Sequence, residues 1–416
     1  MLIDLKMAWR NIWRNPRRTL LTMLAIAFAC ILLVFMLSFQ FGSYDTMIDS
    51  SVKISTGHLQ IQARDYRKNH EIRKVIPDPR PILRILDQTP NILAYTTRAS
   101  AFAMASSANR TYGVMVVGIQ PPSEARVSTL GQIVTQGTYL SARPDARGFY
   151  GALVGRLLAH NLRLSVGDEV TLLGQGRDGS VAAAVVKVQG IYSSGMDELD
   201  RNAIQIPLAA FQDIFSMQGA VHEIVIVGHA LSEIPHLKAE LQKRLKGLKD
   251  EPPLVVLDWD ELLPGLRQAI TMDLVSGAIF YLILIMVVAF SILNTFLMAI
   301  LERTHEFGVM MAMGTRPGRL TRLVMAESAG MTLIGVAAGV LAGILLTGYF
   351  QVHGIDISGS SELLRQYGIP SRIYPRLSLL SVAVGPAAVL LITLTAALYP
   401  ALRIRRLRPV EAMACL

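Results

Sequence analysis

The sequence contains little charge and almost no cysteine. Only 17% of its 416 residues are charged and 52% are hydrophobic, whereas a soluble domain usually carries about 25% charged residues. This deficit indicates that part of the chain lies in lipid. Both cysteines, Cys30 and Cys415, lie outside the long polar segment 42–273. That segment therefore has no disulfide framework.

The usual signatures of catalysis are also missing. The sequence has no G-x-x-x-x-G-K-[ST] phosphate loop, no H-E-x-x-H and no G-x-S-x-G motif. Its eight histidines are scattered, and their spacing does not suggest a metal site. We interpret His58, His160 and His222 as surface or hydrogen-bonded core residues. We therefore expect no catalytic residue, no metal and no cofactor in this chain, and a membrane enzyme is the least favoured class.

Four long apolar runs predict four transmembrane helices. A helix needs about 20 apolar residues to cross the hydrocarbon core, and each run is long enough. A cleaved signal peptide is the rival interpretation of the first run, but a signal h-region has only about 7–15 residues. We therefore expect a retained anchor. The predicted spans are 19–41, 274–301, 323–350 and 377–402.

The net charge of +9 has a distinct distribution along the chain. Residues 42–273 contain 24 basic and 24 acidic residues, so the basic excess lies in 1–18, 302–322 and 403–416. Basic flanks mark the cytoplasmic side of membrane helices and argue against nucleic-acid binding. This pattern predicts cytoplasmic N- and C-termini. It also places residues 42–273 and a short loop, 351–376, outside.

The outer segment mixes strand-like and helix-like runs. Its fold class is therefore a membrane α-helical protein of four transmembrane helices, with a large α+β extracytoplasmic domain inserted between helices 1 and 2. We expect two subdomains, with an inserted lobe near 108–180. The predicted strands are 57–62, 112–119, 169–173, 182–192, 203–207 and 223–227. The predicted helices are 81–88, 153–162, 208–215 and 232–246.

Residues 1–18 form an amphipathic stretch. Trp9 and Trp13 fall on one helical face, Arg10 and Arg14 fall on another, and Pro16 ends the pattern. This favours a helix lying in the inner interface of the membrane. An ordinary juxtamembrane flank is the alternative.

The predicted connection 302–322 contains apolar residues where a cytoplasmic loop is expected. Phe307, Met310 and Met313 lie between Glu302 and Gly314. A short helix with exposed Met and Phe suits docking into an apolar groove of a partner. A connector dipping into the membrane surface explains the same residues equally well.

Glycine recurs at every fourth position in the third apolar run. Gly335, Gly339 and Gly343 form a doubled G-x-x-x-G, which permits close approach of another helix. The alternative is that glycine is simply common in membrane helices.

Several segments together resemble one known family. The stretch Glu302–Gly314 resembles the E-R-x-x-E-I-G-x-x-x-A-x-G segment of the FtsX-like permease superfamily, which includes lipoprotein-releasing (Lol-type) and macrolide-exporter (MacB-type) permeases. Phe307 departs from the pattern, because the family usually has an aliphatic residue there. Further matches, in chain order, are Trp9–Ile26, Gly155–Leu172, Gly190–Leu208 and Tyr399–Met413. Gly190–Leu208 is most similar to Lol-type permeases.

This resemblance implies a permease subunit of an ABC transporter in the bacterial inner membrane. ATP and Mg²⁺ would be bound by a separate dimeric ATPase, and a second permease, identical or paralogous, would complete the complex. ATP-driven mechanical transmission would then extract a lipoprotein or another lipid-linked substrate from the outer leaflet. The alternatives are a MacB-like exporter working with a periplasmic adaptor, or a non-transporting regulator of a cell-wall enzyme. A periplasmic chaperone is a further expected partner.

The resemblance also assigns site residues. Those expected to contact the ATPase are Glu302, Arg303, His305, Glu306, Phe307, Met310, Met313 and Gly314. The candidate substrate cavity between the first and second helices consists of Met36, Phe39, Phe280 and Ile283. Plain lipid-facing or core positions are the alternative for these four.

Overall fold

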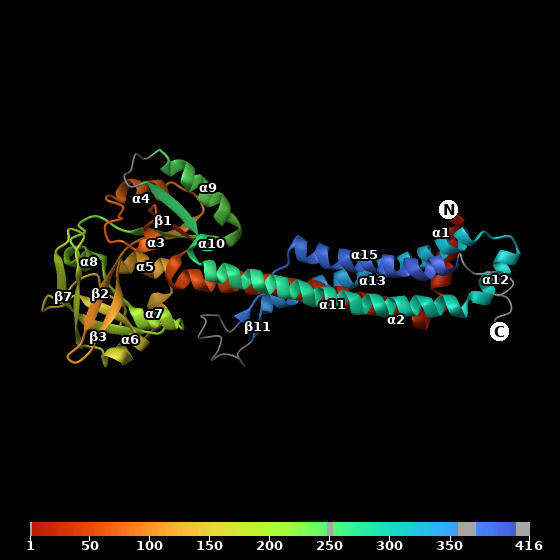
Figure 1. The fold of residues 1–416 in the computed structure, drawn as a ribbon, viewed down its shortest axis with the longest axis horizontal. Helices are drawn as coiled ribbons and strands as arrows, with labels where there is room; N and C mark the ends of the chain where they lie inside the picture. The colour runs from red at the N-terminus through yellow and green to blue at the C-terminus, as the bar shows by residue number, and fades with distance from the viewer. Residues whose placement is uncertain (1, 248–252, 357–371, 405–416) are drawn as a thin grey trace. The chain divides into compact units, whose positions relative to one another are not determined.

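The computed structural model describes residues 2–247, 253–356 and 372–404. The chain divides into two compact units, and each is described here on its own (Figure 1). The first contains residues 1–44 and 269–356 and the part of the chain from 372 onward. The second contains residues 45–268. The predicted tail 403–416 lies outside the described residues from 405 onward, as does most of the predicted loop 351–376.

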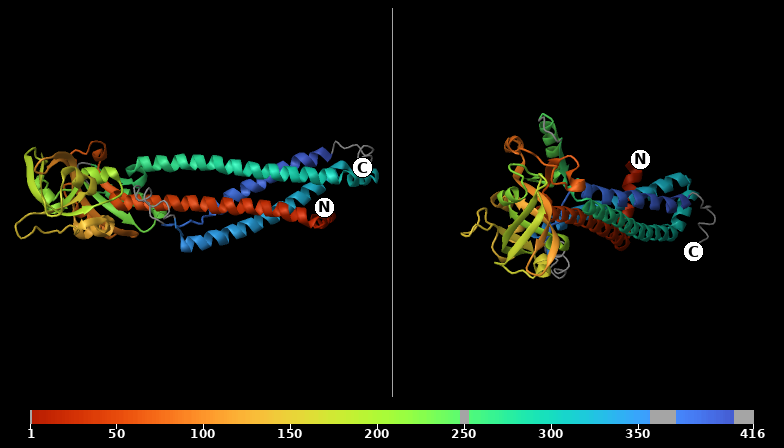
Figure 2. Two further views of the ribbon diagram at one scale, coloured as in Figure 1. Left: turned by 90° about the horizontal axis from the view of Figure 1, so that it is seen from below. Right: turned by 60° about the vertical axis from the view of Figure 1, so that its left-hand side comes forward.

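Four helices are long and apolar enough to cross a membrane. They are α2 (Pro16–Ser51), α11 (Pro264–Glu302), α13 (Pro317–His353) and α15 (Leu379–Arg403). Figures 1 and 2 show these helices from three directions. The predicted fold class, with four apolar helices and a mixed domain between the first two, is confirmed. All four helices include most of the predicted spans, and α2 and α11 continue well beyond them.

Short elements flank these four helices. An N-terminal helix, α1 (Leu2–Ile12), precedes α2, and α12 (Thr304–Ala312) joins α11 to α13. Gly314 has φ +91°, a left-handed conformation that ends α12. Pro317 then begins α13, where its missing N–H costs nothing. A two-stranded pair, β11 (Ile355–Asp356) and β12 (Arg372–Ile373), precedes α15.

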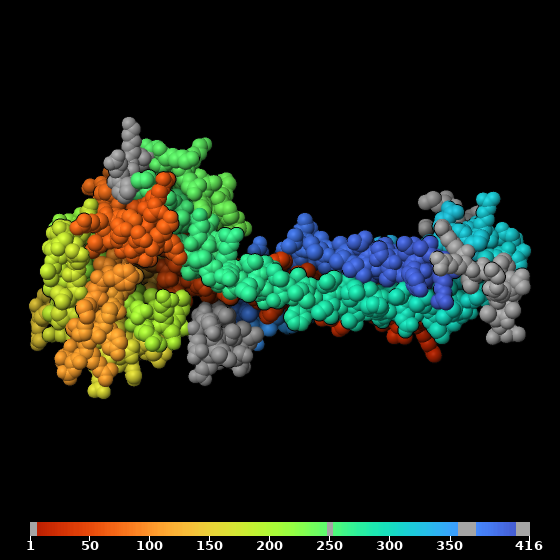
Figure 3. Space-filling view, in the orientation of Figure 1, coloured from red at the N-terminus to blue at the C-terminus, as the bar shows by residue number. Residues whose placement is uncertain are grey.

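The core of the first unit is built around α2. Ile26, Cys30 and Leu33 on this helix pack with residues of α11 and α15. In the most apolar window of each helix, 44% of α2 is buried but only 11% of α11. Figure 3 shows how much of α11 is uncovered (Figure 3). A single chain thus leaves a large apolar surface on α11.

The second unit is a ten-stranded sheet. Its strands are β1 (Leu59–Ala63), β2 (Ile92–Ser106), β3 (Thr111–Ile119), β4 (Val134–Gly137), β5 (Gly151–Gly155), β6 (Glu169–Gln175), β7 (Val181–Tyr192), β8 (Ala203–Pro207), β9 (Glu223–Gly228) and β10 (Leu254–Asp258). The strands between residues 108 and 180 share this sheet with the others, so the predicted lobe boundary stays a prediction.

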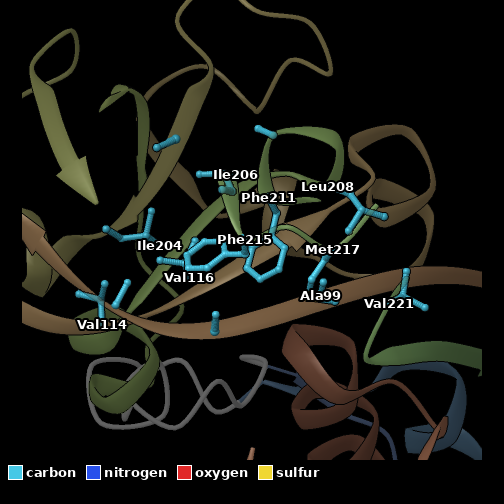
Figure 4. Close-up of a cluster of buried hydrophobic side chains, with 14 of the residues drawn as sticks. Ala99, Val114, Val116, Ile204, Ile206, Leu208, Phe211, Phe215, Met217 and Val221 are labelled. Atoms are coloured by element: carbon cyan, nitrogen blue, oxygen red, sulfur yellow. The ribbon is translucent and has the colours of Figure 1, made fainter. Parts of the chain in front are cut away.

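Six of these strands close on themselves. The pairing runs β2–β3–β8–β5–β7–β6 and returns to β2. Closure leaves these strands without free edges. Alternate side chains point inward, among them Val114, Val116, Ile204 and Ile206, and Phe211 and Phe215 stack beside them with ring centroids 4.5 Å apart (Figure 4).

Short helices cover the sheet. A π-helical turn, η1 (Val52–Thr56), continues α2, and single 3₁₀ turns lie at Leu130–Gln132 and Leu231–Glu233. The α-helices are α3 (Tyr66–Asn69), α4 (Arg80–Asp87), α5 (Pro121–Val127), α6 (Arg156–Leu162), α7 (Asp197–Asn202), α8 (Leu208–Ile214), α9 (Ile234–Leu245) and α10 (Trp259–Leu262).

His222 is a buried polar residue in this unit. Its Nδ1 accepts a hydrogen bond from the Ser100 N–H (3.0 Å), so Nε2 carries the proton toward the Ile72 carbonyl oxygen (3.1 Å). The ring stacks on Tyr66 with centroids 4.8 Å apart. Burial lowers the pKa of His222 to about 4. The predicted role as a satisfied core histidine fits these contacts.

We expect His222 to make the second unit less stable in acid. An unfolded histidine gains its proton near pH 6.5, whereas the folded one gains it near pH 4. Stability should therefore fall by about 3 kcal/mol as the pH drops across that interval. Hydrogen-exchange protection of β2 amides in the full-length protein measures this loss. His222→Asn should flatten the pH slope, and His160→Asn, at an exposed position, should leave it unchanged. Equal slopes in the wild type and His222→Asn would contradict this assignment.

Candidate functional site

Residues 302–316 lie at the end of the first unit where α1, α11, α12 and α13 meet. α11 ends at Glu302, Arg303 breaks the helix, and α12 begins at Thr304. Arg303 donates through Nη1 to Glu327 Oε2 on α13 (2.9 Å) and through Nε to Glu306 Oε2 on α12 (3.3 Å). Its guanidinium also lies 5.3 Å from the centroid of the Phe307 ring. One side chain thus holds the corner between two helices.

The prediction that Phe307 is exposed is wrong. Its side chain is fully buried and packs with Ile300, Leu320 and Val324. Met311 is also buried and Met310 is half-buried in the same cluster. An aromatic residue at this position fills the space between the short α12 and the ends of α11 and α13. Phe307 therefore positions α12 within its own chain and presents no surface to a partner.

Another face of α12 is open. Met313 is 74% exposed, and His305, Val309, Ala312 and Gly314 are also exposed. Of the residues predicted to contact an ATPase, this open tip includes His305, Met313 and Gly314. Glu302, Arg303 and Glu306 are instead engaged in ion pairs within the chain.

The carboxylates of this segment are paired with one arginine of the turn between α1 and α2 and with another at the start of α2. Arg18 donates to Glu302 (2.5 Å) and to the Thr295 carbonyl oxygen (2.9 Å). Arg14 donates to Glu306. This hydrogen bond from Arg14 is the main cause that holds the pKa of Glu306 below its usual range. Glu306 thus stays ionised at neutral pH.

The three glycines of α13 face α2. A Cβ at Gly339 would lie 2.5 Å from the Ala27 carbonyl oxygen, and one at Gly335 would lie 3.0 Å from Ile26 Cβ. At Gly343 the nearest atom would be Val34 Cβ, also 3.0 Å away. α13 therefore approaches α2 to backbone contact along this stripe.

The four candidate cavity residues lie on α2 and α11. Phe280 is 71% exposed, Ile283 and Met36 are exposed, and Phe39 is half-buried beside Phe35. In the single chain these side chains form part of an open apolar surface. Their assignment to a substrate cavity stays a prediction.

A polar clasp near the other end of these helices was not predicted from the sequence. Tyr44 donates to Asp273 Oδ2 (2.5 Å), and Gln40 Nε2 donates to the same oxygen (3.1 Å). Tyr281 donates to Gln40 Oε1 (2.9 Å). Gly277 leaves room for Gln40, since a Cβ there would lie 2.7 Å from Nε2. The clasp ties α2 to α11, and only the polar residues at the ends of two apolar runs could have suggested it.

Four apolar helices with a sheet domain inserted between the first two are the architecture of a class of membrane permeases. Residues 19–243, just over half of the chain, match the MacB-like periplasmic core domain, and residues 278–409 match the FtsX-like permease C-terminal family. The chain belongs to this family of ABC transporter permeases. This confirms the resemblance to the FtsX-like superfamily.

The individual relatives have low sequence identity to this chain, but their matches extend over most of it. The lipoprotein-releasing system transmembrane protein LolC of Xylella fastidiosa (strain Temecula1) is 27% identical and covers 72% of each chain. LolE of Haemophilus influenzae is 25% identical and covers 79% of each chain. The macrolide export ATP-binding/permease protein MacB of Wolinella succinogenes is 24% identical over 99% of this chain and 60% of its own length.

We expect Gly339→Ala to destabilise the helix bundle by about 2 kcal/mol, because the new Cβ would collide with the Ala27 carbonyl oxygen. Thermal inactivation of the detergent-solubilised protein, followed by size-exclusion chromatography, measures the effect. Gly348→Ala is the matched control, since its Cβ would lie 4.0 Å from the nearest atom. Equal thermal stability of the two variants would contradict close packing at Gly339.

Phe307→Ala should cost about 3–5 kcal/mol because it empties a buried aromatic site. Met313→Ala, at the exposed tip, should change stability by less than about 0.5 kcal/mol. Limited proteolysis of the α12 segment in detergent compares the two. A Phe307→Ala protein as resistant to protease as Met313→Ala would show that Phe307 does not hold α12.

Proposed function

We propose that this chain is the non-catalytic permease subunit of a transporter that extracts a lipoprotein or other lipid-linked molecule from the outer leaflet of the bacterial inner membrane. A separate ATPase dimer would bind ATP and Mg²⁺ and supply the energy. A second permease, identical or paralogous, would sit beside this one. The names of the LolC and LolE relatives support the cargo class, and their extensive coverage supports a shared architecture.

The open tip of α12 is the observation that carries the coupling role. An exposed methionine on a short helix suits an apolar groove in a partner, and Met313 has this geometry. The other face of α12 is fixed to α11 and α13 by Arg303 and Phe307. A push on the tip would therefore be passed to both helices and not absorbed by a loose loop.

The proposed topology follows the basic residues. Both termini and α12 would face the cytoplasm, and the sheet domain would face the periplasm. Cargo would enter sideways from the outer leaflet, along the apolar surfaces of α2 and α11 that include Met36, Phe39, Phe280 and Ile283. The exposure of α11 supports such an opening, since this surface needs lipid, cargo or a second permease to cover it.

Met313→Asp should abolish or weaken ATPase binding by at least about tenfold, because a carboxylate would have to enter an apolar groove without a partner. Co-purification of ABC ATPases with the tagged chain from its native host, followed by mass spectrometry of the complex, measures the effect. Val166→Asp is the control, since it places the same charge at an exposed apolar position of the sheet domain. Full ATPase recovery with Met313→Asp, or ATP turnover by the purified chain alone, would refute the proposal.

An exporter of the MacB type is the second candidate. The match to MacB spans 99% of this chain, and such a protein would work with a periplasmic adaptor. A regulator of a cell-wall enzyme is a third. The same co-purification separates them, since recovery of an adaptor or a wall hydrolase in place of a second permease would favour these alternatives.

A further inference from the structure

Helix α1 is attached to the rest of the first unit more firmly than a membrane-surface helix needs to be. Ala8 and Ile12 are each 3% exposed. The helix packs on α13, where a Cβ at Gly330 would lie 3.0 Å from Ile12 Cδ1. Trp9, on an adjacent side of the helix, and Trp13, just beyond its end, are exposed and form an edge-to-face pair. α1 thus offers one face to lipid and one to protein.

A single buried carboxylate joins α1 to the corner of α11 and α12. Glu327 on α13 accepts from Asn11 Nδ2 of α1 through Oε1 (2.6 Å) and from Arg303 Nη1 through Oε2 (2.9 Å). Its side chain is 10% exposed and that of Arg303 is 16% exposed. A pair this buried is little screened, and either partner left alone would be strongly destabilising.

The remaining ion pairs of the corner are weaker. Arg14 and Glu306 are both substantially exposed, and such a pair contributes little by itself. Arg18 lies at the start of α2 and holds Glu302. The elbow between α1 and α2 is closed by Thr19 Oγ1, which donates to the Ile12 carbonyl oxygen (2.6 Å). The corner formed by α11, α12 and α13 therefore contacts both α1 and α2, on either side of the elbow.

The contacts between the corner and the elbow do not fill the space between them completely. A small cavity of about 60 Å³ lies between the elbow and the corner and is lined by both polar and apolar side chains. Its lining includes Asn11, Asn15, Arg18, Glu302, Arg303 and Glu327. A cavity of this size has room for about two water molecules beside these polar side chains. The polar side chains of the corner thus border a space that water can enter.

We propose that Arg303 and Glu327 are positioning residues that lock α1 to the α11–α13 corner, so that α1 moves with α12 as a second lever acting on α2. This inference rests on the proposed function. In this proposal Glu302, Arg303 and Glu306 transfer force within the chain. Contact with the ATPase is made by the open tip of α12. The push would reach α2 by two routes: directly through Arg18 and through the Asn11–Glu327 link.

The experiment measures the distance between α1 and α13 in the assembled complex. Spin labels are placed at Met7→Cys, exposed on α1, and Gly318→Cys, where a Cβ meets open space. The background carries Cys30→Ala and Cys415→Ser. Pulsed electron paramagnetic resonance compares the nucleotide-free complex with one trapped by ATP and vanadate.

In the intact protein we expect one narrow distance that is the same in both states. Arg303→Gln combined with Glu327→Gln should broaden the distribution by about twofold or more and make it depend on nucleotide, because α1 is released. ATPase co-purification and turnover should persist in this variant, whereas genetic complementation should fall by about tenfold. Arg10→Gln, an exposed change on the same helix, is the control and should change neither readout.

The possible negative results test different claims. If no ATPase co-purifies with the wild type, the proposed function fails. If the ATPase binds and turns over but the double variant keeps the narrow distance and full complementation, only the lock fails. If the double variant does not insert, Arg303→Lys replaces it. Lysine has a single ammonium group in place of the fork, and should give an intermediate broadening; a wild-type distribution would overturn the inference.

Discussion

The arrangement of the helices in the first unit depends on the contacts of one buried carboxylate, that of Glu327. Glu327 lies early in α13, in a span that is otherwise apolar, and its side chain is only 10% exposed. A carboxylate in such surroundings has to be matched by donors, or it costs several kcal/mol. Asn11 and Arg303 supply them from two other helices. Satisfying one charge therefore fixes α1, the end of α11 and the direction of α12 together.

The glycine stripe of α13 fixes the other half of the bundle. Contact between the backbones of α13 and α2 leaves no room for lipid between them, and α2 becomes the most buried of the four helices. α11 packs on α2 along its middle and is also held to it by polar contacts near its ends, by Arg18 at one and by the clasp of Gln40, Tyr44 and Asp273 at the other. Between these ends α11 presents large apolar side chains outward. A helix that packs on α2 with one side and is open on the other is suited to form one wall of a lateral opening.

The sequence predicted features that depend on local pattern and missed those that depend on tertiary contact. Four apolar runs and the strands β1, β3, β6, β7, β8 and β9 are visible in composition and alternation. β2 was missed, although it pairs with three other strands, because Ala99, Ala101, Ala103 and Ala105 carry no strand signal. Small residues are needed there, since they point into the closed part of the sheet. Phe307 was wrongly predicted to be exposed, because the sequence of a short loop does not reveal whether an apolar residue is covered by its own chain or by a partner.

The turn η1, which lies in the second unit, has its carbonyl groups bound by protein donors. The last carbonyl groups of a helix have no hydrogen-bond partner within the helix. Here, protein groups donate hydrogen bonds to them. Gly57 N–H donates to the Val52 carbonyl oxygen (2.7 Å) and Thr129 N–H donates to that of Lys53 (2.9 Å). Arg98 donates to the Ser55 carbonyl oxygen and forks onto Glu124 of α5 (2.6 and 3.0 Å). Because this arginine is buried, fraying of the last turn would leave one of its N–H groups without an acceptor, although its charge would stay paired with Glu124. These hydrogen bonds therefore fix the turn η1 to β2 and α5 within the second unit.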